Sequence, residues 1–144
     1  MTDIFARFEK ILESYPAMLS GMDEKELSLK ATPDRWSKKE IIGHLIDSAA
    51  NNHQRFVRAQ FEEDPFIKYD QDSWVDFNYY QQRNSAELIR LWEAYNQSLL
   101  ALIKFIPDKY FKKTVRNGSP HPVTLEFIIH DYVHHLEHHL KQII

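Results

Sequence analysis

The chain has 144 residues, 43% of them hydrophobic, which suits one folded core, and we expect a single domain over residues 1–144. Because there is no cysteine, disulfides and thiolate sites are excluded, and a transition-metal site would have to use His, Asp or Glu. The formal net charge is −3 and there is no basic block, so we expect no binding to nucleic acid. No apolar run approaches the ~20 residues of a membrane span, and the N-terminus lacks a signal-peptide layout. We therefore expect a cytoplasmic protein that does not bind a membrane.

Apolar residues recur at helical spacing in four segments, of which the first covers about residues 3–20. Pro16 is expected to bend or interrupt this helix, and Gly21 is a natural stop. Only three glycines occur in the whole chain, which favours long helices over a turn-rich sheet.

The second and third helices have clear start signals. Ser37 and Glu40 form a capping box, and the helix behind them is expected to run to about Gln60. Asn84 provides the next cap, and the third helix is expected to end just before Pro107.

The last helix follows a short turn region. Asn117-Gly118 predicts a tight turn, in a small hairpin, and Thr124 can cap a helix that runs nearly to the C-terminus. Four amphipathic helices in one small domain predict an all-α fold, a four-helix bundle. The connectors 21–36 and 61–83 are long enough to cross the bundle, so the topology is not expected to be a simple up-down-up-down arrangement.

Four of the eight histidines lie within six consecutive positions of the last helix: His134, His135, His138 and His139. At 100° per residue the first and third of these point away from the apolar face around Ile129, whereas His135 and His139 lie on the shoulder between core and water. Imidazoles at i, i+4 stand on adjacent turns and can share a metal ion. The shoulder pair is better placed to do so, although such pairs also occur by chance on solvated helices.

His44 on the second helix is the candidate for a third ligand. It shares a polar stripe with Asp47, Ser48, Asn51 and Arg55 by i, i+3, i+4 spacing. Such a stripe is usually the solvated face of a helix, and it becomes a metal site only if it borders the same groove as the shoulder pair. Spacing alone leaves both interpretations open.

Two motifs connect these histidines to a known family. Residues 36–48 read W-S-x-x-E-I-I-G-H-L-I-D-S and residues 135–143 read H-x-x-H-H-L-x-Q-I. In this combination the chain resembles the DinB/YfiT-like metalloenzymes over nearly its whole length. The resemblance implies an up-down-down-up four-helix bundle and a divalent metal held by His44, His135 and His139. It also implies that His138, just before the last ligand, does not bind the metal.

Three neutral histidines leave a divalent metal with an open position, where a water or a thiolate can be activated. Zinc and nickel are the metals we expect. Asp47 and Asp131 are the candidate general acids or bases; each could instead orient a ligand histidine or be an ordinary surface carboxylate. The aromatic connector, with Trp74, Phe77 and Tyr79, could cover the open end and bind an apolar substrate, or simply pack the loop.

The resemblance implies a metal-dependent enzyme, a hydrolase or a low-molecular-weight thiol transferase, that acts on a small molecule such as a thiol. Two alternatives stay open at this point. One is a non-catalytic metal-binding or stress-associated helical protein, and the other is a metal-free helical interaction module. A homodimer is consistent with the family and with a helical bundle that has spare apolar surface.

Overall fold

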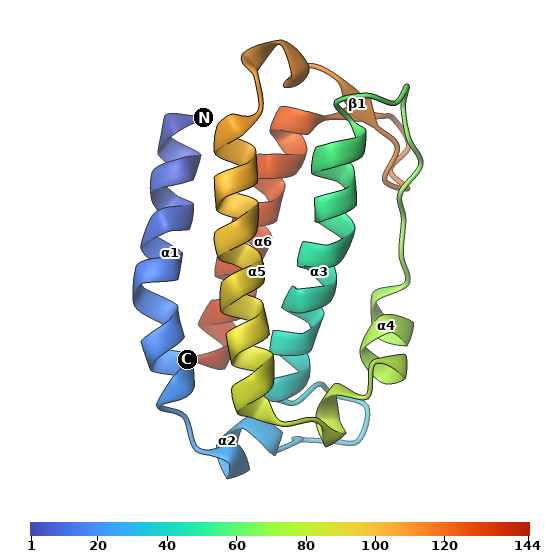
Figure 1. The fold of residues 1–144 in the computed structure, drawn as a ribbon. Coiled ribbons are helices and arrows are strands. Elements are labelled where there is room, and N and C mark those ends of the chain that lie inside the picture. The colour runs from blue at the N-terminus through green and yellow to red at the C-terminus, as the bar shows by residue number, and fades with distance from the viewer.

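Four long helices form the body of the protein in a computed structural model that describes residues 1–144 (Figure 1). They are α1 (Thr2–Ser20), α3 (Lys38–Arg58), α5 (Ser85–Phe105) and α6 (Leu125–Ile143). The chain runs down α1, up both α3 and α5, and down α6, which is the expected up-down-down-up order. Each of α3 and α1 packs against both α5 and α6. No helix is both long and apolar enough to span a bilayer.

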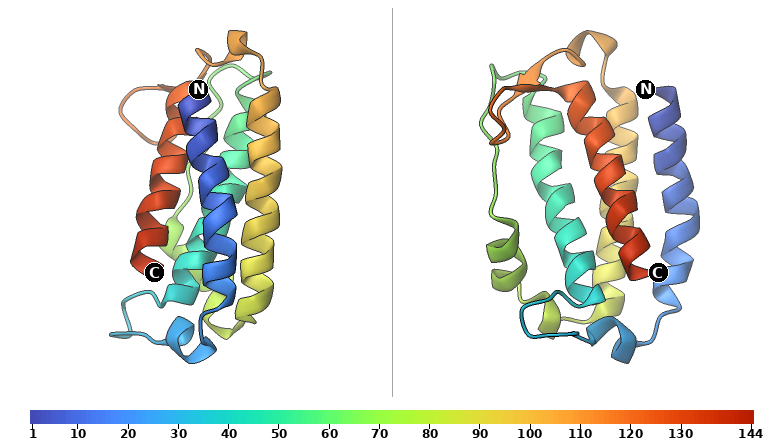
Figure 2. Two further views of the ribbon diagram at one scale, coloured as in Figure 1. Left: turned by 90° about the vertical axis from the view of Figure 1, so that its left-hand side faces the viewer. Right: turned by 180° about the vertical axis from the view of Figure 1, so that it is seen from behind.

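The two long connectors contain short elements of their own. The first includes α2 (Glu24–Ser28), and the second includes α4 (Gln71–Phe77) and the 3-10 turn η1 (Tyr80–Gln82). The second connector descends along the outside of α3 from its C-terminal end to its N-terminal end (Figures 1 and 2). It therefore covers a face of α3 that the other three long helices do not contact.

The predicted hairpin is present above α6. After η2 (Asp108–Tyr110), β1 (Thr114–Val115) pairs antiparallel with β2 (Val123–Thr124), and Gly118 in the turn has φ of +98°. Backbone bonds between Ile67 N and Arg116 O (2.9 Å) and between Arg116 N and Pro65 O (3.0 Å) attach the second connector to this hairpin. The upper end of the connector is thus fixed.

The structure decides one of the two effects expected of Pro16, the interruption of the first helix. Pro16 lies inside α1 and does not interrupt it, because the helix continues to Ser20 and ends at Gly21. A proline removes one backbone hydrogen bond, but Pro16 is buried, and Leu19 in the same last turn is completely buried. Burial of these side chains offsets the lost bond.

The cap of α3 is the local feature that fixes where this helix begins. Ser37 Oγ accepts a hydrogen bond from Glu40 N (3.1 Å), and Glu40 Oε1 accepts one from Ser37 N (3.0 Å). Ser37 Oγ also donates to Gln81 Oε1 of the second connector (2.5 Å). The predicted capping box is therefore confirmed, and it also holds the lower end of the connector.

We expect Ser37→Ala to lower the free energy of unfolding by about 1–2 kcal/mol, the usual effect of losing an N-cap side chain. The Glu40 amide and Gln81 Oε1 would both lose a partner at a residue that is 1% exposed. Urea denaturation measures the change. Ser20→Ala, at an exposed position, is the control, and an equal effect of the two substitutions would contradict the prediction.

Candidate metal centre

Three histidines from two helices meet near the N-terminal end of α3. His44 of α3 and His135 and His139 of α6 each offer a ring nitrogen, and these nitrogens all lie within 4.8 Å of one another. The Nε2 atoms of His44 and His135 are 3.0 Å apart. Tetrahedral bonds of about 2.0–2.1 Å to one metal would separate ligand nitrogens by about 3.4 Å, so the arrangement fits a shared divalent ion.

The packing around these rings keeps them neutral. Burial, and to a smaller extent the two neighbouring histidines, lowers the pKa of His44 to about 3, and burial lowers the pKa of His135 to about 4. The pKa of His139 is also lowered, again by burial. Neutral imidazoles present a lone pair at pH 7, which is the form that binds metal.

Further contacts orient the rings. The indole of Trp36 lies 4.8 Å from the His44 ring between centroids, tilted by 34°. His139 Nδ1 lies 2.8 Å from Gln142 Oε1, an acceptor, so Nδ1 carries the proton and Nε2 keeps its lone pair. A hydrogen bond to the second ring nitrogen is a common accompaniment of metal-binding histidines.

The other histidines lie outside this cluster. His134 is exposed, with Nε2 2.8 Å from Arg7 Nη1, and His138 is exposed as well. His53 is exposed and lies 2.9 Å from the hydroxyl of Tyr95. The structure thus brings together the three histidines named from the sequence and leaves the outward pair apart. Metal binding by the cluster stays a prediction.

Asp47 lies one turn after His44 and is 1% exposed. Its Oδ1 accepts hydrogen bonds from Tyr80 Oη (2.6 Å) and Asn78 Nδ2 (3.1 Å), whereas its Oδ2 is buried without a partner. Burial raises the pKa of Asp47 to about 6, against the opposing effect of the Tyr80 hydrogen bond. The usual reading of this stripe as a solvated face is wrong, because Ser48 and Asn51 are also only 3% exposed.

Asp131 has a different setting. It is exposed on α6, one turn before His135, and does not belong to the histidine cluster. Its charge attracts the guanidinium of Arg55, which donates twice to the Ile67 carbonyl and once to Asn52 Oδ1. The structure therefore places the two predicted aspartates in unequal positions, one enclosed and one at the surface.

Tyr80 and Asn78 were not identified from the sequence, although one signal was available. Gly43 lies in the middle of α3, where glycine is unfavourable, and a Cβ there would lie 2.1 Å from Tyr80 Cδ2. The missing side chain lets the ring pack directly on the helix and reach Asp47. The residue before it, Tyr79, has φ of +56°, in the left-handed region.

The cluster opens to solvent at His139. A cleft of about 460 Å³ lies there, within the range of small-molecule sites. It is lined by Asp34, Arg35, Trp36, Ile41, Gln71, Asp72, His139 and Gln142. Its lining comes from the loop between α2 and α3 (residues 34–36), from the first turn of α4 (residues 71 and 72), from α3 and from α6. The second connector thus borders the cleft through polar residues, while Trp74 and Phe77 are absent from its lining.

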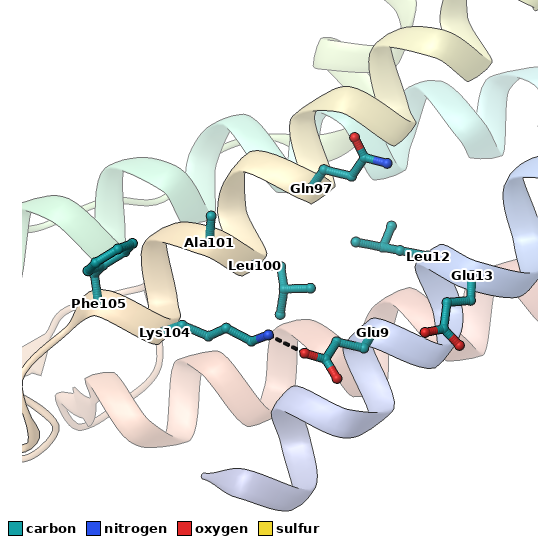
Figure 3. Close-up of a pocket in the computed structure, with 8 residues that line it drawn as sticks. All are labelled: Glu9, Leu12, Glu13, Gln97, Leu100, Ala101, Lys104 and Phe105. Atoms are coloured by element: carbon teal, nitrogen blue, oxygen red, sulfur yellow. Dashed lines mark hydrogen bonds and ion pairs between the residues drawn. The ribbon is translucent and has the colours of Figure 1, made fainter.

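A second hollow of about 460 Å³ lies between α1 and α5 (Figure 3). Leu12 and Leu100 face it, and Lys104 pairs with Glu9 across it. It contains no histidine and lies on other helices than the cluster, so it is not part of the candidate centre.

Known proteins resemble this chain over most of its length. The sequence profile of the DinB superfamily matches residues 7–143. YfiT of Bacillus subtilis, named as a candidate metal-dependent hydrolase, is 28% identical over 144 residues, which cover 93% of this chain and 79% of the relative. A relative of the same description from Halalkalibacterium halodurans is 26% identical and covers 88% and 74% of the two chains.

Two solved structures share the fold. That of YfiT, described as having an unusual four-helix bundle topology, superposes with a TM-score of 0.82 at 26% identity and covers 96% of this chain and 83% of its own. A mycothiol-dependent maleylpyruvate isomerase superposes with a TM-score of 0.81 at 15% identity. This chain covers 60% of the isomerase, so that likeness concerns the fold alone.

Proposed function

The chain belongs to the DinB superfamily, and we propose that it is a metal-dependent enzyme that acts on a small molecule, as a hydrolase or a low-molecular-weight thiol transferase. His44, His135 and His139 hold a divalent metal, zinc or nickel. The observation that carries the proposal is the convergence of three neutral imidazoles beside a cleft of small-molecule size. The description of the curated relatives as candidate metal-dependent hydrolases supports it.

A three-histidine site leaves an open position at which a bound divalent metal lowers the pKa of a water or a thiol. The chain's own residues prepare this position. The low pKa values of His44 and His135 keep both rings unprotonated, and Gln142 holds the His139 ring with Nε2 free. Trp36 packs on His44 and limits its rotation.

We assign the general base to Asp47. Tyr80 and Asn78 hold its Oδ1, and Oδ2, which is buried without a hydrogen-bond partner, is the oxygen to which we assign the proton. A carboxylate with a pKa of about 6 is a better base near neutral pH than one with an ordinary pKa. Asp131 is the second candidate; it is exposed and lies outside the histidine cluster.

The choice between the two reactions rests on different observations. The names of the curated relatives favour hydrolysis. The proposal of thiol transfer rests instead on the resemblance of the two histidine motifs to the DinB/YfiT-like metalloenzymes. A single domain over residues 1–144, a cytoplasmic location and a homodimer stay predictions.

Elemental analysis of untagged protein tests the proposal. We expect near-stoichiometric metal in the unchanged protein and in His134→Ala, and loss of the metal in His44→Ala and His135→Ala. His134 is the matched control because it neighbours His135 on α6 but points to solvent. Ester hydrolysis and thiol transfer to an electrophile are then assayed with the unchanged protein and His44→Ala.

Three results would contradict the proposal. If the unchanged protein binds no metal after incubation with zinc or nickel, the metal-free interaction module becomes the better account. Equal loss of metal in His134→Ala would mean that the wrong histidine pair was chosen. Stoichiometric metal without activity on either substrate class would indicate a non-catalytic metal-binding protein.

A further inference from the structure

The cleft beside His139 is lined by charges from separate segments. Arg35 lies on the loop before α3, and Asp72 lies in the first turn of α4. Asp34, the third charged residue, already accepts a hydrogen bond from Thr32 Oγ1 (2.6 Å). That bond, together with the charges of Arg35 and Lys30, lowers the pKa of Asp34. The lining as a whole carries one more negative than positive charge.

The Arg35 guanidinium and the Asp72 carboxylate have no ion pair and no side-chain hydrogen bond within the chain. Neither side chain takes part in the ion pairs of the structure, and only the backbone nitrogen of Arg35 is bonded, to Thr32 O (3.1 Å). Both are exposed. Both are therefore free to pair with a ligand. The Arg35 guanidinium can donate two parallel hydrogen bonds, and the Asp72 carboxylate can accept hydrogen bonds.

Trp36 and Ile41 supply the apolar part of the cleft lining. Trp36 and Ile41 are both half-buried, and the Trp36 ring already packs on His44. The amide side chains of Gln71 and Gln142 complete the lining without adding charge. A molecule bound here would meet the exposed charges of Arg35 and Asp72 and the more buried side chains of Trp36 and His139.

We infer that this cleft binds a zwitterionic small molecule, one that carries both an ammonium group and an oxyanion such as a carboxylate, with the oxyanion at Arg35 and the ammonium at Asp72. The inference rests on the proposed function, because His139 is what joins the cleft to the metal site. A dianion would meet the carboxylates of Asp34 and Asp72, and a simple cation would leave Arg35 without a partner. Two opposite charges in one cleft select among ligands mainly because a ligand with mismatched charge binds more weakly.

A matched set of probes tests the inference. NMR titration of the zinc-loaded protein is carried out with 5-aminopentanoate, pentanoate and pentylammonium, which share one carbon chain and differ in charge. We expect affinity to decrease in the order zwitterion, cation, anion, because the lining is net negative. Each exposed ion pair contributes a factor of about two to five, so these weak affinities differ measurably.

Paired variants separate the two charged contacts. Arg35→Gln should weaken 5-aminopentanoate and pentanoate by about two- to five-fold and leave pentylammonium unchanged or slightly tighter. Asp72→Asn should weaken 5-aminopentanoate and pentylammonium but not pentanoate. Asp76→Asn is the control, because Asp76 is exposed on the same helix, changes the net charge equally and does not line the cleft.

Equal affinity for the three probes, or an equal effect of Asp76→Asn and Asp72→Asn, would overturn the inference. Binding of pentanoate that Arg35→Gln leaves unchanged would do so too, since it would indicate a carboxylate held by zinc alone. The proposed function is tested separately by zinc uptake. If the protein takes up no zinc, the same titrations of the metal-free protein still decide whether the cleft prefers a zwitterion.

Discussion

Gly43→Ala is expected to lower the free energy of unfolding by about 3 kcal/mol, at the upper end of the usual effect of overpacking a core. The new Cβ would lie 2.1 Å from Tyr80 Cδ2 and 2.3 Å from Tyr80 Cγ. The ring is 2% exposed and its hydroxyl is bonded to Asp47, so it cannot move aside without breaking that bond. Urea denaturation followed by circular dichroism measures the change.

Gly21→Ala is the matched control. A Cβ at Gly21 would meet the carbonyl oxygens of Ala17 at 3.4 Å and Met18 at 3.7 Å, which are ordinary contacts, and the residue has right-handed helical angles. We expect the free energy of unfolding to change by less than about 1 kcal/mol. The change should be an increase where the substitution reduces the conformational entropy of the unfolded chain. Adding Tyr80→Ala to Gly43→Ala should cost less than the sum of the two single effects, because the first substitution removes the clash. Additive effects would mean that the two residues are not in contact.

The helices could be predicted because residues close in sequence determine where each helix begins and ends. The residues Ser37, Asn84 and Thr124 each cap a helix through their own side chain, as expected from the sequence. Pro16 does not interrupt α1, because tertiary burial outweighs the local rule that proline ends a helix. The path of the second connector was not predictable, since Asn78 and Tyr80 contact Asp47 from more than thirty positions away in the chain.

The histidine cluster could be predicted in part for the same reason. The angle of each residue around α6 separates His135 and His139 from His134 and His138 without knowledge of any other helix. Whether His44 meets this pair depends on how α3 and α6 pack, and that came from the family resemblance. The burial of Asp47 could not be read from its helix, because the segment that covers it has no helical period of its own.

The metal-free protein is expected to become less stable as the pH falls from about 6 to about 4. Three buried groups together should lower its free energy of unfolding by roughly 1.4 kcal/mol per pH unit. In the unfolded chain His44 and His135 take up protons near pH 6.5, but in the folded chain only near pH 3 and 4. Asp47 acts in the opposite sense, because its carboxyl takes up a proton near pH 6 when folded and near pH 3.8 when unfolded. Between about pH 4 and 6 the unfolded chain therefore binds two more protons than the folded chain at the histidines and one fewer at Asp47, a net excess of one. The corresponding stability is present at neutral pH and is lost on acidification.

Comparison of variants isolates these groups from the other carboxylates of the chain. Asp47→Asn removes the opposing proton, so the pH dependence between about pH 4 and 6 should become about twice as steep. His44→Ala should make it shallower by about one proton. The measurement is the free energy of unfolding in urea, with a chelator present, at half-unit steps of pH. A slope that Asp47→Asn does not change would mean that this carboxyl titrates normally, and its assignment as the general base would lose its support.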